Sequence, residues 1–295
     1  MTRMAHRLIG LTAQTMIHAG SGSADDVLDL PIQREAHNDW PCIYGSSMKG
    51  ALRANAEAQG LDQALVRAVF GPDTANASTH AGSLLVSDAR LLLLPVRSLT
   101  GHFRRVTCPA ALKRLCRDLE RLGLLATLPV APEPAPGEAL VAETSGGASD
   151  LYLEEFRFDE TQYALDAWVS LLSQLCGEDY RAEIARQLTV VDDDSFRHLC
   201  RSAMPVLPHV RLDNESKTVV DGALWYEECL APETVLYVCL ATQPSRYEDL
   251  PLSADGLLEE LVEAMFLRNA WLQVGGNETV GMGWFRVRLV DGSDA

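Results

Sequence analysis

Two glycine-containing loops with polar neighbours could place backbone N–H groups against a phosphate. One follows His18 and contains Gly20 and Gly22, and the other covers residues 275–283. Glycine lets the backbone approach an anion closely, as it does in many phosphate-binding loops. Neither loop matches a Walker or a dinucleotide-binding motif, because no Lys-Ser/Thr pair or ribose-binding acid follows at the required spacing. The pattern therefore leaves phosphate binding and ordinary tight turns both open.

Three aspartates follow the first of these loops and could bind a metal ion. Asp25, Asp26 and Asp29 offer hard carboxylate oxygens, which suit magnesium. The EF-hand pattern is absent, so a solvated acidic loop is the alternative. His18, at the end of the preceding strand, could act as a base or bind a phosphate, or it could simply be hydrogen-bonded.

Lys49 and Arg53 lie four residues apart, on one face of a helix predicted over residues 46–58 with a serine as its N-cap. The two side chains could clamp a backbone phosphate. A solvated basic face is the alternative that the same spacing allows.

Charge is distributed unevenly along the chain. Its 295 residues include 25 Lys and Arg against 41 Asp and Glu, and this net charge of −16 argues against nucleic-acid binding through bulk positive charge. A local basic surface is compatible with that total, because residues 88–121 contain eight basic and three acidic residues. Residues 131–160 contain eight acids, Arg157 and several prolines, which predicts a surface linker or insertion.

The hydrophobic pattern predicts the elements that position these residues. Strands are expected over residues 5–14, 82–94, 271–274 and 284–290, and helices over 108–122, 161–175, 195–203 and 254–268. The acids at 192–194 are expected to cap the third of these helices, a metal cluster being the alternative. An extended hairpin with a turn near residues 213–216 is expected between 206 and 241. This order is compatible with a ferredoxin-like α+β sandwich that carries large insertions.

The cysteine pattern and the absence of a long apolar run predict where in the cell the protein is found. Seven cysteines without a Cys-x-x-Cys pair predict a reduced, cytoplasmic protein with buried thiols. The most hydrophobic run, residues 91–94, is ended by Pro95, so no membrane partner is expected.

Several of these segments together resemble the signature of the RAMP superfamily. They are His-Ala-Gly-Ser-Gly from His18, Asp-Leu-Pro-Ile-Gln-Arg-Glu from Asp29 and Tyr-Gly-Ser-Ser-Met-Lys-Gly-Ala-Leu-Arg from Tyr44. More narrowly, the chain resembles the repeated backbone subunit of type III-B CRISPR effector (Cmr) complexes, and further matching stretches are residues 87–90, 95–98, 106–109, 222–228 and 275–283. Asn277 departs from the pattern, which has an acid there, and the acidic segment 131–160 is peculiar to this chain.

The resemblance implies one domain over residues 1–295, with a ferredoxin-like or RNA-recognition-motif-like palm and finger and thumb insertions. The hairpin near residues 206–232 would be the thumb. Copies of the chain would assemble along one guide CRISPR RNA with other type III-B subunits, and complementary target RNA would be cut at regular intervals.

The resemblance also implies roles for individual residues. Asp29 matches the family's cleavage-loop aspartate and would position the attacking 2′-hydroxyl of the target, or hold Mg²⁺ or another divalent cation. Glu227 and Asp88 are weaker candidates for assistance. The residues assigned to guide-RNA binding are His18, Gly20, Gly22, Arg34, Ser46, Ser47, Lys49, Arg53, Gly275, Gly276, Thr279, Gly281 and Gly283.

Three other functions remain as alternatives. The chain could be a non-cleaving scaffold of the same complex, although Asp29 argues against this. It could be a guide-RNA-processing endoribonuclease of the same superfamily, which would not assemble along single-stranded guide. It could also be a metal- or nucleotide-dependent enzyme acting on a small molecule, which would be stabilised by nucleotide and would not bind RNA.

Overall fold

The computed structural model describes residues 4–24, 28–72, 80–125, 127–142, 150–267 and 269–290. A large twisted sheet organises the chain, in the order β13-β14-β1-β12-β4-β5-β9-β6-β8-β7, with β2 paired to β4 and β3 to β12. The strands are β1 (Ala5–Ala13), β2 (Cys42–Ile43), β3 (Leu84–Val86), β4 (Ala89–Ser98), β5 (His102–Thr107), β6 (Glu138–Val141), β7 (Asp150–Leu153), β8 (Phe156–Gln162), β9 (Leu188–Val190), β12 (Val235–Thr242), β13 (Trp271–Gln273) and β14 (Trp284–Val290).

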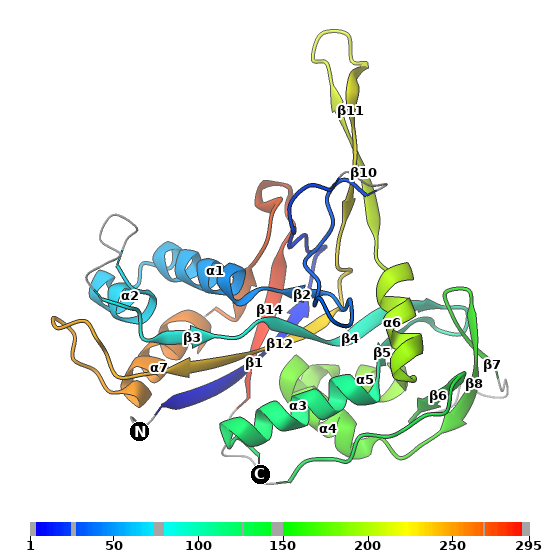
Figure 1. Ribbon diagram of the computed structural model, residues 1–295, viewed down its shortest axis with the longest axis horizontal. Coiled ribbons are helices and arrows are strands. Elements are labelled where there is room, and N and C mark those ends of the chain that lie inside the picture. Colours follow the sequence, from blue (N-terminus) through cyan, green and yellow to red (C-terminus); the bar gives the residue numbers. More distant parts are fainter. Residues whose placement is uncertain are drawn as a thin grey trace.

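Helices cover both faces of this sheet (Figure 1). They are α1 (Gly45–Ala58), α2 (Gln63–Phe70), α3 (Pro109–Leu122), α4 (Asp166–Cys176), α5 (Arg181–Gln187), α6 (Asp193–Ser202) and α7 (Ala254–Val262). The α+β class predicted from the sequence is confirmed, and the ferredoxin-like palm stays a prediction.

Strand β1 separates two hydrophobic cores because its successive side chains point to opposite faces. Ile9 and Leu11 belong to the core that includes residues of α1, α2 and α7, whereas Leu8 belongs to the core that includes residues of α3 and α4. Gly10 lies on the α4 side, where a Cβ atom would come within 2.1 Å of the Leu175 carbonyl oxygen. The absence of a side chain at this position allows α4 to pack directly on the sheet.

A two-stranded hairpin stands apart from the sheet and projects from the body of the molecule (Figure 1). Its strands are β10 (Val206–Leu212) and β11 (Val219–Glu228). Asp213 closes the turn by accepting hydrogen bonds from the backbone N–H groups of Glu215 and Ser216, and these bonds lower the pKa of its carboxyl group. The predicted hairpin is therefore confirmed, with its turn at the expected residues, but it ends at Glu228. The last part of the predicted range, from Val235, forms β12 of the large sheet instead.

The acidic segment 131–160 is not the linker that its composition suggested. It contains β6, β7 and the start of β8, and all three are strands of the large sheet. Leu140, Leu151 and Phe158 are buried, and the carboxylate of Glu160 forms an ion pair at 3.0 Å with the guanidinium of Arg104. The linker alternative is therefore wrong for the described part of this segment, and the insertion alternative stays a prediction. Exposed acids such as Glu133 and Asp159 give the segment its surface-like composition although its apolar residues are buried in the sheet.

Three element boundaries also differ from the sequence prediction. The helix predicted over 161–175 begins only at Asp166, because the preceding residues form β8. The strand predicted over 82–94 is interrupted at residues 87–88 and then continues through Pro95 to Ser98. The helix predicted over 254–268 is α-helical to Val262 and becomes a π-helical turn over Glu263–Leu267.

Helix caps are partly as predicted. Asp192 caps α6 by accepting a hydrogen bond from the Ser195 N–H at 3.0 Å. The N-cap of α1 is Tyr44, without a side-chain cap, and not a serine. Instead, Asp88 Oδ1 accepts a hydrogen bond from the Gly45 N–H at 2.7 Å. A residue distant in sequence thus provides the acceptor for an N–H group that has no partner within α1.

Candidate functional site

The loop between β1 and β2 lies against the foot of the hairpin (Figure 1). The Leu30 N–H donates to the Tyr226 carbonyl oxygen at 3.1 Å, and the Glu228 N–H donates to the Leu30 carbonyl oxygen at 3.0 Å. Leu30 thereby forms a parallel bridge with Glu227. A stretch of this loop therefore extends the edge of β11 by main-chain pairing.

Asp29 is held where the loop meets the hairpin. Its Oδ2 accepts a hydrogen bond from the Tyr226 backbone N–H at 2.8 Å, and the side chain is half-buried. Asp25 and Asp26, the other acids considered as metal ligands, lie outside the described residues. The structure thus gives Asp29 a fixed position next to β11.

Glu227 is buried beside this loop among polar partners. Its Oε1 accepts a hydrogen bond from Asn277 Nδ2 and lies 3.5 Å from His18 Nδ1. Its Oε2 lies 3.6 Å from His209 Nε2, and the His209 ring stacks on Trp225. The amide at position 277 therefore supplies an N–H donor where a carboxylate would repel Glu227.

Both glycine loops converge on His18. Nδ1 of His18 lies 2.8 Å from the Glu228 carbonyl oxygen, and the Gly276 N–H donates to the His18 carbonyl oxygen at 2.9 Å. A Cβ atom on Gly20 would come within 2.7 Å of His18 Nε2, and one on Gly275 within 2.4 Å of the His18 oxygen. Close packing against backbone is thus sufficient to require Gly275, whereas at Gly20 the added atom would meet the end of the His18 side chain. Phosphate binding by the loops stays a prediction.

The cluster of His18, Glu227 and Cys229 is poorly suited to a metal, although its potential ligand atoms lie within 4.8 Å of one another. A carbonyl oxygen can only accept, so the short contact to Glu228 places the proton on His18 Nδ1. Burial, together with the charges of Glu227 and Glu228, raises the pKa of the Cys229 thiol to about 12. The Nδ1 atom of His18 is thus engaged by the backbone, which leaves only Nε2 as a ligand, and Cys229 would have to lose its proton to bind a metal.

Asp29 fits a loosely bound magnesium ion better than this cluster does. Magnesium commonly keeps several waters and binds through one or two carboxylates together with substrate phosphates. A half-buried carboxylate anchored through one oxygen meets that requirement once a phosphate is present.

Gln33 connects the first glycine loop to the start of α1, and the sequence reasoning did not single it out. Its Nε2 donates to the Gly20 carbonyl oxygen at 3.0 Å and to Ser47 Oγ at 3.2 Å, while its Oε1 accepts the Tyr44 N–H at 2.6 Å. Its place inside the Asp-Leu-Pro-Ile-Gln-Arg-Glu motif was the available signal.

The basic residues of α1 lie in a different environment. Lys49 Nζ donates to the Leu84 carbonyl oxygen at 3.2 Å, and burial together with the neighbouring Arg53 lowers the pKa of Lys49. Arg53 pairs with Glu57 and donates to the Gly71 carbonyl oxygen. In the described contacts, neither these residues nor Asp88 is joined to Asp29.

The remaining residues assigned to guide binding divide by exposure. Gly22, Ser46, Thr279 and Gly281 are exposed. Gly283 is buried, and its N–H donates to the Met16 carbonyl oxygen at 2.9 Å.

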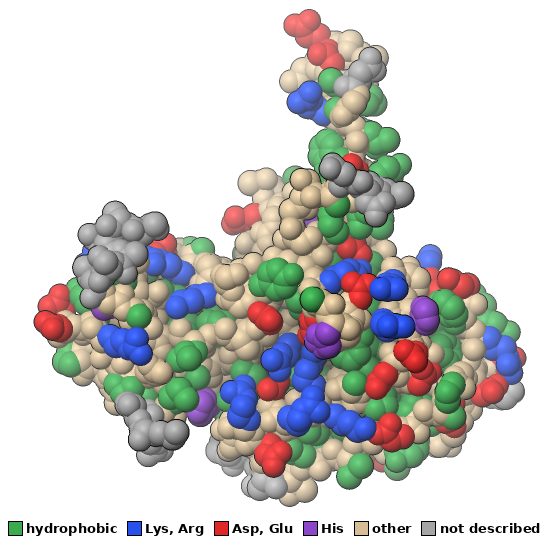
Figure 2. All heavy atoms as spheres, viewed as in Figure 1, with side chains coloured by type: hydrophobic (Ala, Val, Ile, Leu, Met, Phe, Trp, Pro, Cys, Tyr) green, Lys and Arg blue, Asp and Glu red, His purple; other side chains and the backbone are tan. Residues whose placement is uncertain are grey.

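The basic surface is smaller than the charge count over residues 88–121 suggested. Arg104 and Arg105 are buried, and Arg114 and Arg90 pair with Glu35 and Asp118. Figure 2 shows that blue side chains nonetheless gather over α3. The exposed basic residues of α3 are Lys113, Arg117 and Arg121.

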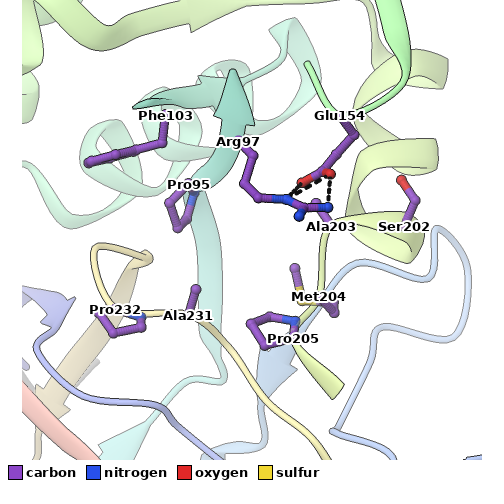
Figure 3. A pocket seen from close by; sticks show the side chains of 10 residues that line it. All are labelled: Pro95, Arg97, Phe103, Glu154, Ser202, Ala203, Met204, Pro205, Ala231 and Pro232. Atoms are coloured by element: carbon purple, nitrogen blue, oxygen red, sulfur yellow. Dashed lines mark hydrogen bonds and ion pairs between the residues drawn. The ribbon is translucent and has the colours of Figure 1, made fainter. Parts of the chain in front are cut away.

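A largely apolar pocket of about 460 Å³ lies on another side of the hairpin's foot (Figure 3). Its walls include Phe103, Met204 and Pro232, and Arg97 forms an ion pair with Glu154 at one edge of it. None of the residues assigned from the sequence to catalysis or to guide binding lines this pocket. Asp29, Glu227 and His18 therefore lie along the hairpin edge and not in this cavity.

No helix in the described part of the chain is long and apolar enough to cross a membrane. All seven cysteines are free thiols, and Cys116 alone among them is more than marginally exposed. The prediction of buried thiols is thus confirmed for six of the cysteines, and Cys116 is partly buried.

Comparison with known proteins places the whole chain in one family. The model of the RAMP superfamily matches residues 11–286. The CRISPR system Cmr endoribonuclease Cmr4 of Pyrococcus furiosus is 35% identical over 286 residues, which is 96% of this chain and 95% of that protein. The CRISPR system CMR subunit Cmr4 of Saccharolobus solfataricus is 25% identical, with 95% of each chain covered.

The fold agrees with this relationship. The crystal structure of oligomeric Cmr4 from Pyrococcus furiosus superposes with a TM-score of 0.76 at 29% identity, covering 98% of this chain and 99% of that one. The resemblance read from the sequence motifs is therefore confirmed. The chain belongs to the RAMP superfamily and, within it, to the branch that contains Cmr4 of Pyrococcus furiosus.

Proposed function

We propose that this chain is the backbone subunit of a type III-B CRISPR complex, that it binds guide RNA and that it cleaves complementary target RNA. The observation that carries the proposal is the anchoring of Asp29 at the foot of a projecting hairpin by the Tyr226 N–H. A relative that is 35% identical over nearly the whole chain is named a Cmr endoribonuclease.

The hairpin is suited to separating stacked bases. One of its faces exposes apolar side chains along both strands, namely Val206, Val210, Leu212, Val219, Leu224 and Tyr226. Apolar side chains inserted between base steps unstack them and bend the duplex. The hairpin would thereby turn one target linkage toward Asp29, which lies beside its foot.

Cleavage would proceed by attack of the target's own 2′-hydroxyl on the adjacent phosphate. The new bond would close a 2′,3′-cyclic phosphate while the bond from phosphorus to the 5′-oxygen of the next nucleotide breaks; the proton of the 2′-hydroxyl would pass to solvent, and the 5′-oxygen would take up a proton and leave as a hydroxyl. A carboxylate is a weak base for an alcohol, so Asp29 would act by orienting the hydroxyl. The Tyr226 N–H restrains Asp29 Oδ2 and so directs the carboxylate. A divalent cation bound at Asp29 would supply positive charge to offset the charge that develops on the phosphate.

Guide RNA would be held by its backbone, because base pairing supplies the sequence recognition. Lys49 and Arg53 on α1 and the exposed positions of the two glycine loops are the proposed contacts. Self-association along the guide is supported by the oligomeric crystal structure of the related Cmr4.

Cleavage of end-labelled complementary RNA tests the proposal in complexes assembled with guide RNA, partner subunits and magnesium. Wild type should give a regularly spaced ladder, and Asp29→Ala should abolish it while keeping target binding. Asp88→Ala is the matched control, because it also removes an aspartate carboxylate. The carboxylate of Asp88 accepts a hydrogen bond from the Gly45 N–H at the start of α1 and, among the described residues, does not contact the hairpin. Binding without a ladder in the wild type would make the chain a scaffold, and loss of assembly in Asp29→Ala would overturn the catalytic assignment.

A guide-processing endoribonuclease is the second candidate, favoured by the histidines beside the buried Glu227. Incubation of the chain with precursor RNA hairpins, without partner subunits, tests this alternative. Cutting of the hairpins there would favour it.

A further inference from the structure

We infer that Arg34 is a positioning residue for the loop that carries Asp29, and that it acts through the buried carboxylate of Glu228. The inference rests on the proposed function of Asp29. It replaces the expectation that Arg34 contacts guide RNA.

The guanidinium of Arg34 donates hydrogen bonds to three acceptors, which lie in three different parts of the fold. Its Nη2 donates to Glu228 Oε1 at 2.5 Å. Its Nη1 donates to the carbonyl oxygens of Asp39, in the same loop, at 2.8 Å and of Cys200, in α6, at 3.0 Å. The arginine thereby ties the loop and α6 to the last residue of β11.

Glu228 in turn forms hydrogen bonds with the residues that follow Asp29 in the loop. While Oε1 is paired with Arg34, Oε2 accepts the Ile32 N–H at 3.0 Å. The backbone N–H of Glu228 also donates to the Leu30 carbonyl oxygen at 3.0 Å. One residue of β11 therefore holds the loop at two points, one and three residues beyond Asp29.

The pair is shielded from water, which makes it sensitive to the loss of either partner. The side chain of Arg34 is 18% exposed and that of Glu228 is 6% exposed. Removal of one member of a buried ion pair leaves an uncompensated charge, whereas replacement of both members by neutral groups is often tolerated. Without Arg34, the Glu228 carboxylate would move toward water and release the Ile32 N–H.

The same loop contains a second ion pair that offers a matched control. Glu35 accepts two hydrogen bonds from Arg114 Nη1, at 2.5 and 2.8 Å, with 11% and 13% of the two side chains exposed. This pair connects the loop to α3 and not to the hairpin. It matches the Arg34 pair in burial and charge but does not bear on the Asp29–Tyr226 contact.

The test compares Arg34→Met, Glu228→Gln, the double variant and Arg114→Met in complexes assembled with guide RNA. Single-turnover cutting is measured at saturating target, and guide affinity is measured as a function of salt. We expect Arg34→Met to slow cutting by about 10-fold or more, because the variant loses stabilisation of the transition state and not binding of the ground state. Guide affinity and its salt dependence should stay unchanged. The double variant should recover most of the rate, and Arg114→Met should lower it less than Arg34→Met does.

Three results would overturn the inference. A weaker guide affinity with a smaller salt dependence, at an unchanged rate of cutting, would make Arg34 a phosphate contact. A double variant no faster than Arg34→Met would show that Glu228 is not the intermediary. An equal loss of rate in Arg114→Met would show a general loosening of the loop.

Asp29→Ala, measured beside these variants, separates this inference from the proposed function. If Asp29→Ala cuts normally, the proposed function fails and Arg34 has no cleavage loop to position. If Asp29→Ala is inactive and Arg34→Met cuts normally, only the inference about Arg34 fails. Arg34→Lys replaces Arg34→Met if the latter does not assemble. The lysine keeps the positive charge but loses the guanidinium that reaches the acceptors on Glu228, Asp39 and Cys200, so its cutting rate and guide affinity are compared with those of wild type in the same way.

Discussion

Asn277 and Glu227 are joined by a hydrogen bond from the side-chain amide of the first to the buried carboxylate of the second. Asn277 belongs to the second glycine loop and Glu227 to the hairpin strand β11, so the bond connects two segments that are fifty residues apart. The asparagine is also the position where the family motif led us to expect an acid. The contact explains why an amide is favourable in this chain.

Asn277→Asp should destabilise the fold by about 2–4 kcal/mol at neutral pH, because it places a second carboxylate against a buried one. The loss should diminish as the pH falls, since protonation of one carboxyl group relieves the repulsion and restores a donor. Urea unfolding of the chain between pH 5 and pH 8 measures both effects. Equal stability of variant and wild type throughout would show that Glu227 does not require the amide donor.

Gly275→Ala should cost more stability than Gly281→Ala, although both glycines have a positive φ angle, of 96° and 83°. At Gly281 no atom lies within 4 Å of an added Cβ, so the backbone conformation alone is penalised, by about 1 kcal/mol. At Gly275 the Cβ would also clash with the His18 carbonyl oxygen. Thermal unfolding of the two variants gives the difference, and similar melting temperatures would contradict the packing argument.

Lys49→Ala should weaken guide-RNA binding and reduce the slope of log affinity against log salt by about 0.7, the value for one phosphate contact on a single strand. Because burial and Arg53 lower the pKa of Lys49, its contribution should be lost, as the pH rises, earlier than that of an ordinary lysine. Lys49→Arg should keep the binding and remove this pH dependence. An unchanged salt slope in Lys49→Ala would exclude a phosphate contact.

Val210→Ser combined with Leu224→Ser should slow target cutting without destabilising the chain. The two residues face each other across the hairpin, and each is about half exposed, at 49% and 52%. Surface substitutions of this kind usually change stability by less than about 0.5 kcal/mol. Cutting rate and melting temperature are measured beside Leu99→Ser, an equally apolar exposed position away from the hairpin. A rate equal to wild type would argue against a wedge.

The sequence by itself determined the features that depend on local pattern. The alternation of residues in 206–228 around an Asp-Asn-Glu-Ser turn is sufficient to predict the hairpin, because turn chemistry and strand period act over a few residues. The clusters of motif residues from His18 to Arg53 are sufficient to indicate the family. The choice of Asp29 as the candidate catalytic residue also came from its motif and stays a prediction, and the structure adds the hydrogen bond that restrains its carboxylate.

Only the tertiary structure decided which partner each charged group has. Asp88 was grouped with Asp29 and instead accepts the first N–H of α1, and Arg34 was grouped with the guide contacts and is paired with Glu228. The acids after residue 131 were interpreted as part of a surface linker or insertion, yet the side chain of Glu160 is buried against Arg104. Charged residues, unlike the apolar residues of a helix or strand, do not recur at a regular spacing along the chain. The partners of each charged group come from elements that are distant in sequence and close in the fold. Composition and spacing therefore cannot distinguish a charge that is neutralised inside the fold from one that is free to meet RNA.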